Sequence, residues 1–265
     1  MTSRSYLFVP GDRPERFDKA VAAGPDVTVL DLEDAVLPEA KDRARAAIGA
    51  WLQAGGRAAV RVNGSGTQWH AEDVALLASP GVTHALVPKA EDPADLARIA
   101  AALPDGMPIV PVIESALGLW NARGIAESAG VVQLAFGSVD FQLDTGIEAE
   151  GEALLYARSR LVLASAVARI AAPVDGVTVA LDDPAQLAAD VARARDLGFG
   201  GKLCIHPRQV AAVHEGFAPS PEEIRRAEQI VQAAGASAAG AIRLDGKLID
   251  RPVVERAQRT LARAG

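Results

Sequence analysis

The chain has 265 residues, of which 49% are hydrophobic, and it carries a formal net charge of -7. A single α/β barrel has about 250 residues, so this length predicts one large core. The acidic balance argues against a nucleic-acid partner, because such a partner requires a clustered basic face on the protein.

Apolar, strand-like runs alternate with segments of helical spacing along most of the chain. The predicted strands are 5–10, 27–31, 58–62, 83–87, 109–113, 131–136, 176–180 and 202–205. The predicted helices are 16–23, 40–52, 71–77, 93–103, 117–126, 154–171 and 184–197. This alternation is typical of βαβ units in a parallel sheet. Eight strands are the number that a closed barrel needs, whereas an open doubly wound sheet usually has about six.

The segment that follows the eighth strand is not needed to close a barrel. It is predicted to begin with a helix at 221–234, with Ser220 as N-cap, and a linker of small residues at 234–240. A hairpin around Asp245 and Gly246 at 242–250 and a final helix at 252–262 follow. The sequence therefore predicts an α/β fold, a TIM (β/α)8 barrel over 1–220, with a C-terminal helical arm or lid over 221–265.

Cysteine usage and hydropathy predict a cytoplasmic protein. Cys204 is the only cysteine, so no internal disulfide can form. The apolar stretch after Arg4 is too short for the core of a signal peptide, and no run approaches the roughly 20 apolar residues of a membrane span. We therefore expect neither a membrane nor a nucleic acid as a partner.

Charged residues stand where the predicted strands end. They are Asp12, Arg13, Asp31, Glu33, Asp34, Arg61, Lys89, Glu114 and Asp140. The C-terminal ends of parallel barrel strands open on one face, so side chains distributed in this way converge on one site. This distribution is typical of an enzyme.

Glu114 and Asp140 form the most informative pair, because each closes a hydrophobic strand and the two strands are adjacent. Two carboxylates with no histidine or cysteine nearby suit Mg²⁺ or Mn²⁺, which prefer oxygen ligands and retain several waters. A structural role stays open, in which one carboxylate caps a helix and the other pairs with an arginine. The pair predicts a metal site at the barrel mouth.

Arg61 ends the third strand, where its planar fork matches a substrate carboxylate. The alternative is an internal salt bridge with Asp31, Glu33 or Asp34. These three carboxylates are more than one salt bridge to Arg61 would require. We therefore expect Glu33 and Asp34 to orient metal-bound water.

Two further turns stand at strand ends. Residues 11–17 contain Arg13 and Arg16 and can hold a phosphate, although neither a dinucleotide fingerprint nor a P-loop is present. His206 precedes Pro207 after the eighth strand, and neither His206 nor Cys204 has a visible partner for nucleophilic catalysis.

Taken together, these segments resemble the citrate lyase β-subunit-like (HpcH/HpaI aldolase) family, which includes malyl-CoA and citramalyl-CoA lyases. The segments that carry the resemblance are Phe8–Gly11, Asp31–Ala35, Val60–Asn63, Pro88–Lys89, Ile113–Glu114, Phe136–Asp140 with Asp144, and Gly201–Pro207. The resemblance extends from Ser3 to about Leu261, and the combination is specific although the single pieces are not.

The resemblance implies a Mg²⁺-dependent lyase that breaks or forms a carbon–carbon bond between an acyl-CoA and a small keto acid such as glyoxylate, pyruvate or oxaloacetate. The family's metal ligands fall on Glu114 and Asp140, and its carboxylate-binding arginine falls on Arg61. Its catalytic aspartate falls on Asp250, which would reach the site of a neighbouring subunit in a homo-oligomer, a trimer or a dimer of trimers.

Further contacts with the substrate are also expected. Backbone N-H groups of Gly137 and Ser138 are expected to bind the keto-acid carboxylate beside Glu114. The residues expected to contact the coenzyme A part of the substrate are Arg13, Arg16, His206 and Pro207.

Four alternatives remain open at the level of the sequence. A class I aldolase would use Lys89 or Lys202 as a Schiff base, and a class II pyruvate aldolase would use a similar metal site on free hydroxy acids. The chain could instead be a β subunit of a citrate lyase complex that acts on a carrier-bound citryl thioester, or a non-catalytic subunit. Hydrolysis of the thioester is the fourth alternative.

Overall fold

The computed structural model describes residues 3–236 and 241–264. Its barrel strands are β1 Ser5–Pro10, β2 Val27–Asp31, β3 Ala58–Arg61, β4 Val82–Val87, β5 Ile109–Ile113, β6 Ala135–Phe136, β7 Val174–Asp175 and β8 Gly201–Cys204. These strands close a barrel in sequence order, with every neighbouring pair parallel and β8 paired with β1. The predicted TIM barrel is confirmed.

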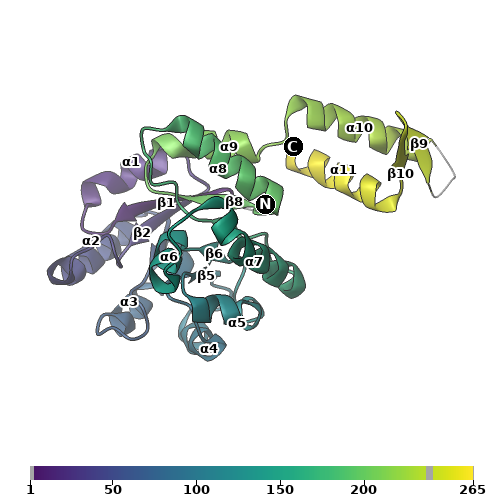
Figure 1. Cartoon of the computed structure of the whole chain (residues 1–265). Coiled ribbons are helices and arrows are strands. Elements are labelled where there is room, and N and C mark those ends of the chain that lie inside the picture. Colours follow the sequence, from purple (N-terminus) through teal and green to yellow (C-terminus); the bar gives the residue numbers. More distant parts are fainter. Residues whose placement is uncertain (1–2, 237–240, 265) are drawn as a thin grey trace. The chain divides into compact units, whose positions relative to one another are not determined.

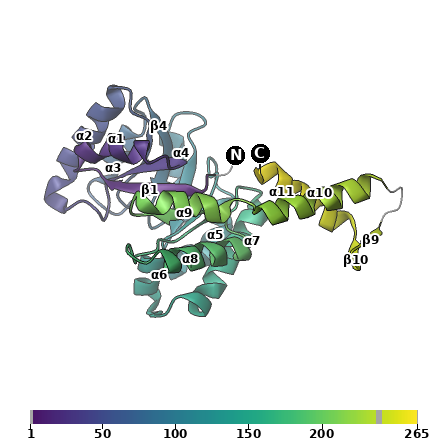
Figure 2. The ribbon, with the colours of Figure 1, turned by 90° about the horizontal axis from the view of Figure 1, so that it is seen from above.

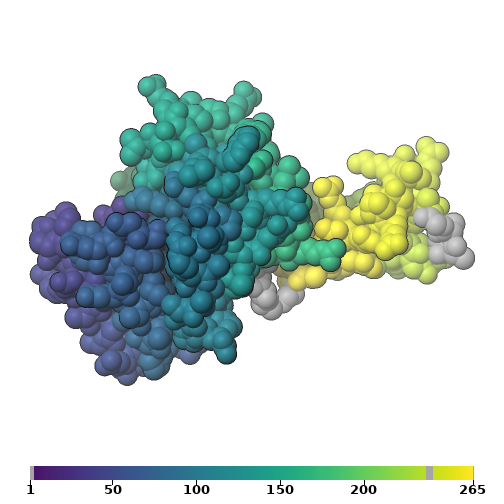
Figure 3. Space-filling view, turned by 90° about the horizontal axis from the view of Figure 1, so that it is seen from below, coloured from purple at the N-terminus to yellow at the C-terminus, as the bar shows by residue number. Residues whose placement is uncertain are grey.

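Helices surround the strands in the order in which the chain visits them (Figure 1). They are α1 Phe17–Ala22, α2 Lys41–Gln53, α3 His70–Leu76, α4 Pro93–Ala102, α5 Ala116–Ala126, α6 Ser138–Thr145, α7 Leu155–Ala168, α8 Pro184–Leu197 and α9 Arg208–Phe217, with 3-10 turns η1 Pro14–Arg16, η2 Pro38–Ala40 and η3 Gly151–Leu154. Helices α8 and α9 lie side by side (Figures 1 and 2). In the space-filling view, the residues of α4 and α5, coloured blue-green, lie on the outside of the barrel unit (Figure 3).

The barrel interior is packed with apolar side chains. Alternate residues of each strand point inward, such as Val27 and Val29 of β2 and Val110 and Val112 of β5. The residues between them also lie buried, because helices cover the outer face of a parallel barrel. The interior is therefore a core, and chemistry is confined to the strand ends.

The chain divides into two compact units, 1–214 and 215–265. The second unit contains α10 Pro221–Gly235, the antiparallel strands β9 Ile242–Leu244 and β10 Lys247–Ile249, and α11 Arg251–Ala264. Ser220 caps α10 through a capping box with Glu223, as predicted for the N-cap. The predicted linker lies partly outside the described residues, at 237–240. The predicted boundary between barrel and arm, between residues 220 and 221, stays a prediction.

The second unit has a small core of its own. Ala227 and Ile230 of α10 pack with Ile249 and with Ala257 of α11. In both views α10 and α11 lie side by side, with the hairpin at one end of the pair (Figures 1 and 2). Among the described residues, no helix is both long enough and apolar enough to cross a membrane.

The seventh strand is the main difference from the predicted elements. It was expected at 176–180 but consists of Val174–Asp175. Asp175 lies fully buried and accepts a 2.8 Å hydrogen bond from Nε of Arg158 on α7. A charged residue in a sequence argues against a buried strand at that position. The arginine that pairs with Asp175 lies 17 positions earlier, too far away for a local sequence pattern to indicate the pair.

Candidate active site

The C-terminal ends of the barrel strands surround a cavity of about 340 Å³. Its polar lining consists of Asp31, Asp34, Arg61, Glu114, Ser138 and Asp140, and its apolar lining includes Phe8, Val112, Phe136, Val177, Leu203 and Ile205. Asp31 and Arg61 are the last residues of β2 and β3, and Glu114 directly follows β5. The predicted convergence of strand-end side chains on one site is therefore seen for these residues.

Glu114 is held tightly at the wall of this cavity. It is 4% exposed, and its Oε1 accepts a 2.6 Å hydrogen bond from the backbone N-H of Lys89. A Cβ atom at Gly137 would lie only 2.5 Å from Oε2 of Glu114, so the carboxylate occupies space that only glycine leaves free. Burial raises the pKa of Glu114 to about 8, and the charges of Glu33 and Asp140 add to this effect.

Helix α6 brings Ser138 and Asp140 to the same cavity. Gly137 is its N-cap, and Asp140 lies in its first turn, where the helix dipole favours a negative charge. Ser138 is 1% exposed, and its hydroxyl has no hydrogen-bond partner among the described residues. The Oγ of Ser138 lies against Gly176, so close that an added Cβ atom there would clash with it. The backbone N-H of Gly137 donates a 3.0 Å hydrogen bond to the carbonyl oxygen of Ile113, so the first N-H at the N-terminus of α6 that could bind an anionic oxygen is that of Ser138.

Arg61 forms an internal salt bridge, which the sequence analysis gave as the alternative to substrate binding. Its Nε and Nη2 each donate a 2.6 Å hydrogen bond to the carboxylate of Asp31. Its Nη1 lies 3.0 Å from Oε2 of Glu33. The guanidinium also lies 4.9 Å above the ring of Phe8, so it is fixed on several sides at the edge of the cavity.

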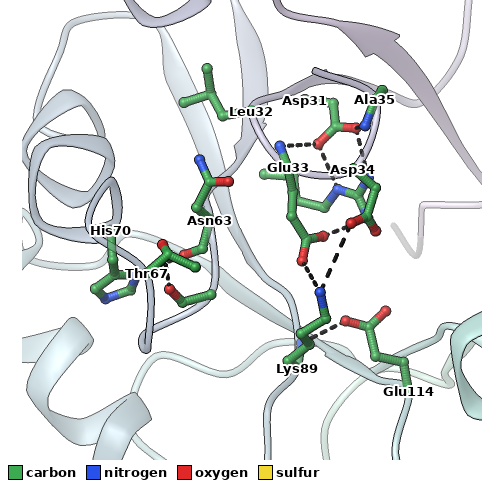
Figure 4. Close-up of polar contacts among 12 residues, drawn as sticks. Asp31, Leu32, Glu33, Asp34, Ala35, Asn63, Thr67, His70, Lys89 and Glu114 are labelled. Atoms are coloured by element: carbon green, nitrogen blue, oxygen red, sulfur yellow. Dashed lines mark hydrogen bonds and ion pairs between the residues drawn. The ribbon is translucent and has the colours of Figure 1, made fainter. Parts of the chain in front are cut away.

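Lys89 connects two carboxylates that follow different strands, Glu33 after β2 and Glu114 after β5, as Figure 4 shows. Its backbone N-H bonds Glu114, while its amine donates a 2.8 Å hydrogen bond to Oε1 of Glu33. Its φ of 49° lies in the left-handed region, which costs energy for a residue with a Cβ atom. Burial raises the pKa of Glu33, although Arg61 and Lys89 oppose that effect.

A buried lysine that the sequence analysis did not single out orders the loop after β2. The amine of Lys41 donates hydrogen bonds to the carbonyl oxygens of Leu32 and Glu33 and to Oδ1 of Asn63, at 2.6–2.7 Å. These bonds fix the backbone that carries Glu33 and Asp34. Lys41 begins an amphipathic helix, so its sequence environment is that of an ordinary surface residue.

The two lysines proposed for a Schiff base have different environments. The hydrogen bond to Glu33 raises the pKa of Lys89 although burial opposes it, so its amine stays protonated and is a poor nucleophile. Burial lowers the pKa of Lys202, but that amine donates to the carbonyl of Gly176 and does not line the cavity. Neither environment favours a class I aldolase.

The residues expected to contact coenzyme A do not line the cavity. Arg13 and Arg16 follow β1 and are exposed, and His206 and Pro207 follow β8, which pairs with β1. Asp250 belongs to the second unit, where its carboxylate accepts a 3.4 Å hydrogen bond from the backbone N-H of Val253 at the start of α11.

The donor set at the cavity fits a hard divalent cation. Glu114 and Asp140 supply oxygen ligands, and the described residues contain no group of three or more His, Cys, Asp or Glu side chains arranged around one ion. A cation held by two carboxylates retains several sites for water or substrate oxygens, which is the usual arrangement for Mg²⁺. Such a cation would also offset the repulsion that raises the pKa of Glu114.

Comparison with known proteins gives a consistent result. Residues 4–207 match the family described as HpcH/HpaI aldolase/citrate lyase. A citrate lyase subunit beta-like protein of Deinococcus radiodurans is 37% identical over 98% of this chain and 96% of the relative. A (3S)-malyl-CoA thioesterase of Cereibacter sphaeroides is 35% identical over 98% of this chain and 94% of the relative.

A solved structure covers the chain equally well. It is that of protein CitE from Mycobacterium tuberculosis in complex with magnesium, acetoacetate and coenzyme A. Its TM-score to this structure is 0.88 at 31% sequence identity, and the match covers 99% of this chain and 98% of that one.

Proposed function

The chain belongs to the HpcH/HpaI aldolase/citrate lyase family, and on that premise we propose that it is a Mg²⁺-dependent carbon–carbon lyase acting on a 3-hydroxyacyl-CoA. Cleavage would yield an acyl-CoA and a small keto acid. The single observation that carries the proposal is that Glu114 and Asp140 line one cavity together with Arg61. The magnesium and coenzyme A bound by the Mycobacterium tuberculosis protein support the same assignment.

Glu114 and Asp140 would hold the metal, with Mn²⁺ as a substitute. When bound there, the cation supplies a Lewis acid for the substrate's hydroxyl and carboxylate oxygens. The backbone N-H of Ser138, with the unpaired Ser138 hydroxyl, would hold the carboxylate of the keto-acid part. The N-H of Gly137, which the sequence analysis also assigned to this carboxylate, instead donates a 3.0 Å hydrogen bond to the carbonyl oxygen of Ile113. Glu33 and Asp34 would orient water around this group.

Arg61 and Asp250 would perform the remaining steps. In the cleavage direction the hydroxyl loses its proton, the bond between the carbinol carbon and the thioester's α-carbon breaks, and its electron pair passes into the thioester as an enolate. A proton then returns to the α-carbon to give the acyl-CoA. Arg61 would add positive charge beside the reacting oxygens, and Asp250 of a neighbouring subunit would exchange the proton.

The coenzyme A part of the substrate would lie outside the cavity. Arg13 and Arg16 after β1 would bind its phosphates, with His206 and Pro207 after the adjacent β8 as further contacts. This arrangement would place the thioester at the cavity entrance, and it involves neither a nucleic acid nor a membrane. We propose a homo-oligomer, a trimer or a dimer of trimers, as the working form.

Chelation tests the proposal most directly. The purified protein should release a keto acid from malyl-CoA or citramalyl-CoA with Mg²⁺, lose this activity in EDTA, and regain it with Mg²⁺ or Mn²⁺. Asp140→Asn should be inactive and should bind Mn²⁺ weakly in an electron paramagnetic resonance titration, while its circular dichroism matches the wild type. Activity that is indifferent to chelation, with borohydride-dependent labelling of Lys89, would overturn the metal mechanism.

Hydrolysis of the thioester is a second candidate, favoured by the malyl-CoA thioesterase of Cereibacter sphaeroides among the relatives. The two reactions release different products, because cleavage leaves the thioester intact and hydrolysis liberates a free thiol. Simultaneous detection of keto acid with a hydrazine reagent and of thiol with a disulfide reagent separates them. Thiol without keto acid would support the hydrolase.

A further inference from the structure

Gln209 joins the two connections that follow β7 and β8. It lies in the first turn of α9 and is 3% exposed. Its Oε1 accepts hydrogen bonds from the backbone N-H groups of Ile205 and His206, at 2.9 and 3.2 Å. Its Nε2 donates a 2.8 Å hydrogen bond to the carbonyl oxygen of Thr178. One buried amide thus bonds the backbone of two segments that are far apart in sequence.

Side chains hold the connection that follows β7. This part of the chain lies between β7 and α8 and belongs to neither element. The amine of Lys202 donates a 2.6 Å hydrogen bond to the carbonyl oxygen of Gly176, and Gln209 bonds the carbonyl oxygen of Thr178. The backbone is therefore fixed on both sides of Val177.

The two connections form part of the cavity wall, because Val177 and Ile205 both line the cavity. The charged residues of the lining end or follow β2, β3, β5 and β6, whereas β1 and β8 contribute Phe8 and Leu203. Strand β7 pairs with β8, and β8 pairs with β1, so these apolar residues form one side of the cavity. The proposed contacts with coenzyme A also follow β1 and β8, and the thioester would lie on this side.

We propose that Gln209 is a positioning residue for the thioester part of the substrate. It would act through Val177 and Ile205, whose backbone it holds, and would itself touch neither the metal nor the substrate. This inference rests on the proposed function and adds a residue to it. An apolar wall contacts the thioester in the ground state and in the transition state alike, so a displaced wall should raise KM and leave kcat nearly unchanged. The metal and the keto acid lie on the charged side and should bind as before.

Gln209→Met tests this role, because methionine has a similar length and makes none of the three hydrogen bonds. Gln133→Met is the matched control. Gln133 is also 3% exposed, and its amide accepts a 2.7 Å hydrogen bond from the hydroxyl of Tyr6 and donates one of 2.7 Å to the carbonyl oxygen of Ala172. Tyr6 lies near the start of β1 and Ala172 precedes β7, so Gln133 joins elements at the opposite end of the barrel from the cavity.

Kinetics of the full-length, Mg²⁺-loaded protein separate the two variants. With malyl-CoA or citramalyl-CoA, whichever the wild type cleaves better, Gln209→Met should raise KM at least about tenfold and keep kcat within about twofold. Its affinities for Mn²⁺ and pyruvate should match the wild type, and Gln133→Met should keep the wild-type KM. An unchanged KM in Gln209→Met, or an equal rise in Gln133→Met, would overturn the inference while leaving the lyase intact. A wild type that cleaves neither thioester would overturn the proposed function and the inference with it.

Hydrogen exchange tests the positioning without turnover. In Gln209→Met, the amides of Ile205 and His206 should exchange at least about tenfold faster than in the wild type, whereas Gln133→Met should leave them unchanged. Unchanged exchange in Gln209→Met would show that Gln209 does not hold this backbone, and the inference would fail.

Gln209→Glu serves as a second variant if the methionine variant does not fold. It keeps an oxygen for the N-H groups of Ile205 and His206 but places its other oxygen against the carbonyl of Thr178, so only the connection after β7 is released. KM for the thioester should rise at least about threefold, with kcat nearly unchanged. A wild-type KM in this variant would contradict the proposal equally.

Discussion

The guanidinium of Arg61 forms two parallel hydrogen bonds, each 2.6 Å long, with the carboxylate of Asp31. Asp31 also accepts hydrogen bonds from the backbone N-H groups of Glu33 and Ala35, so it connects the arginine to the acidic loop after β2. This pair fixes the guanidinium plane at the cavity edge. Two of the five N-H donors of the arginine bond Asp31, and Nη1 lies 3.0 Å from Glu33, so most of the hydrogen-bonding capacity of the guanidinium is used within the protein.

Arg61→Lys tests whether this geometry serves the substrate. Lysine keeps the charge but loses the planar fork, so we expect KM to rise and kcat to fall together, by about tenfold or more in kcat/KM. Arg45→Lys is the matched control, because Arg45 is also partly buried and bonded to a carboxylate, that of Asp73. Wild-type kinetics in Arg61→Lys would assign Arg61 to the internal salt bridge alone.

The raised pKa of Glu114 predicts how the stability of the metal-free protein depends on pH. Because the pKa of about 8 in the folded protein exceeds the ordinary 4.5, the folded state binds the proton more tightly than the unfolded state. This stabilisation is complete below the ordinary pKa and is lost as the pH rises towards about 8. Urea denaturation in EDTA should therefore show a loss on the order of a few kcal/mol between pH 5 and pH 8, as roughly 1.4 kcal/mol per pKa unit predicts.

Mg²⁺ should reverse this trend, because a bound cation stabilises the carboxylate. The increase in Tm on adding Mg²⁺ should thus be larger at pH 8 than at pH 5. Glu114→Gln keeps an oxygen for the N-H of Lys89 but cannot ionise, so its stability should vary less over this range and should not respond to Mg²⁺. A variant that responds to Mg²⁺ like the wild type would remove Glu114 from the metal site.

Lys89 gives a prediction about backbone strain. At its φ of 49° a glycine lacks the clash of a Cβ atom, so Lys89→Gly should be about 1 kcal/mol more stable than Lys89→Ala in urea denaturation. Both variants lose the amine that donates to Glu33, so the difference between their free energies of unfolding reports the effect of the backbone conformation alone. Equal stability, or a more stable alanine variant, would show that the left-handed conformation is not strained.

The sequence predicted the barrel because its strands are apolar and its charged residues lie at the strand ends. The same pattern placed Asp31, Arg61 and Glu114 around one cavity. It could not reveal that Lys89 bridges Glu114 and Glu33, because that role depends on a left-handed backbone and on strands far apart in sequence.

Local patterns also failed where long-range partners decide the structure. The buried Asp175 made β7 hard to predict, because its charge is offset by residues of other elements, Arg158 on α7 and Lys202 on β8. The roles of Asp140 and Ser138 were predicted from their place after an apolar run, and their assignment to metal and substrate stays a prediction.

Asp250 provides the last test, because it belongs to the second compact unit and can act in catalysis only from an arm that reaches a barrel mouth. Asp250→Asn should bind Mn²⁺ and pyruvate like the wild type but turn over at least about 100-fold more slowly, since an amide cannot exchange the proton. Mixing it with inactive Glu114→Ala under conditions of subunit exchange should restore part of the activity, because some interfaces then join an intact Asp250 to an intact metal site. Exchange is verified by mass spectrometry of isotope-labelled subunits, and each variant mixed with itself is the control. If exchange occurs without recovery, Asp250 serves its own subunit or only caps α11, where it accepts the hydrogen bond from Val253.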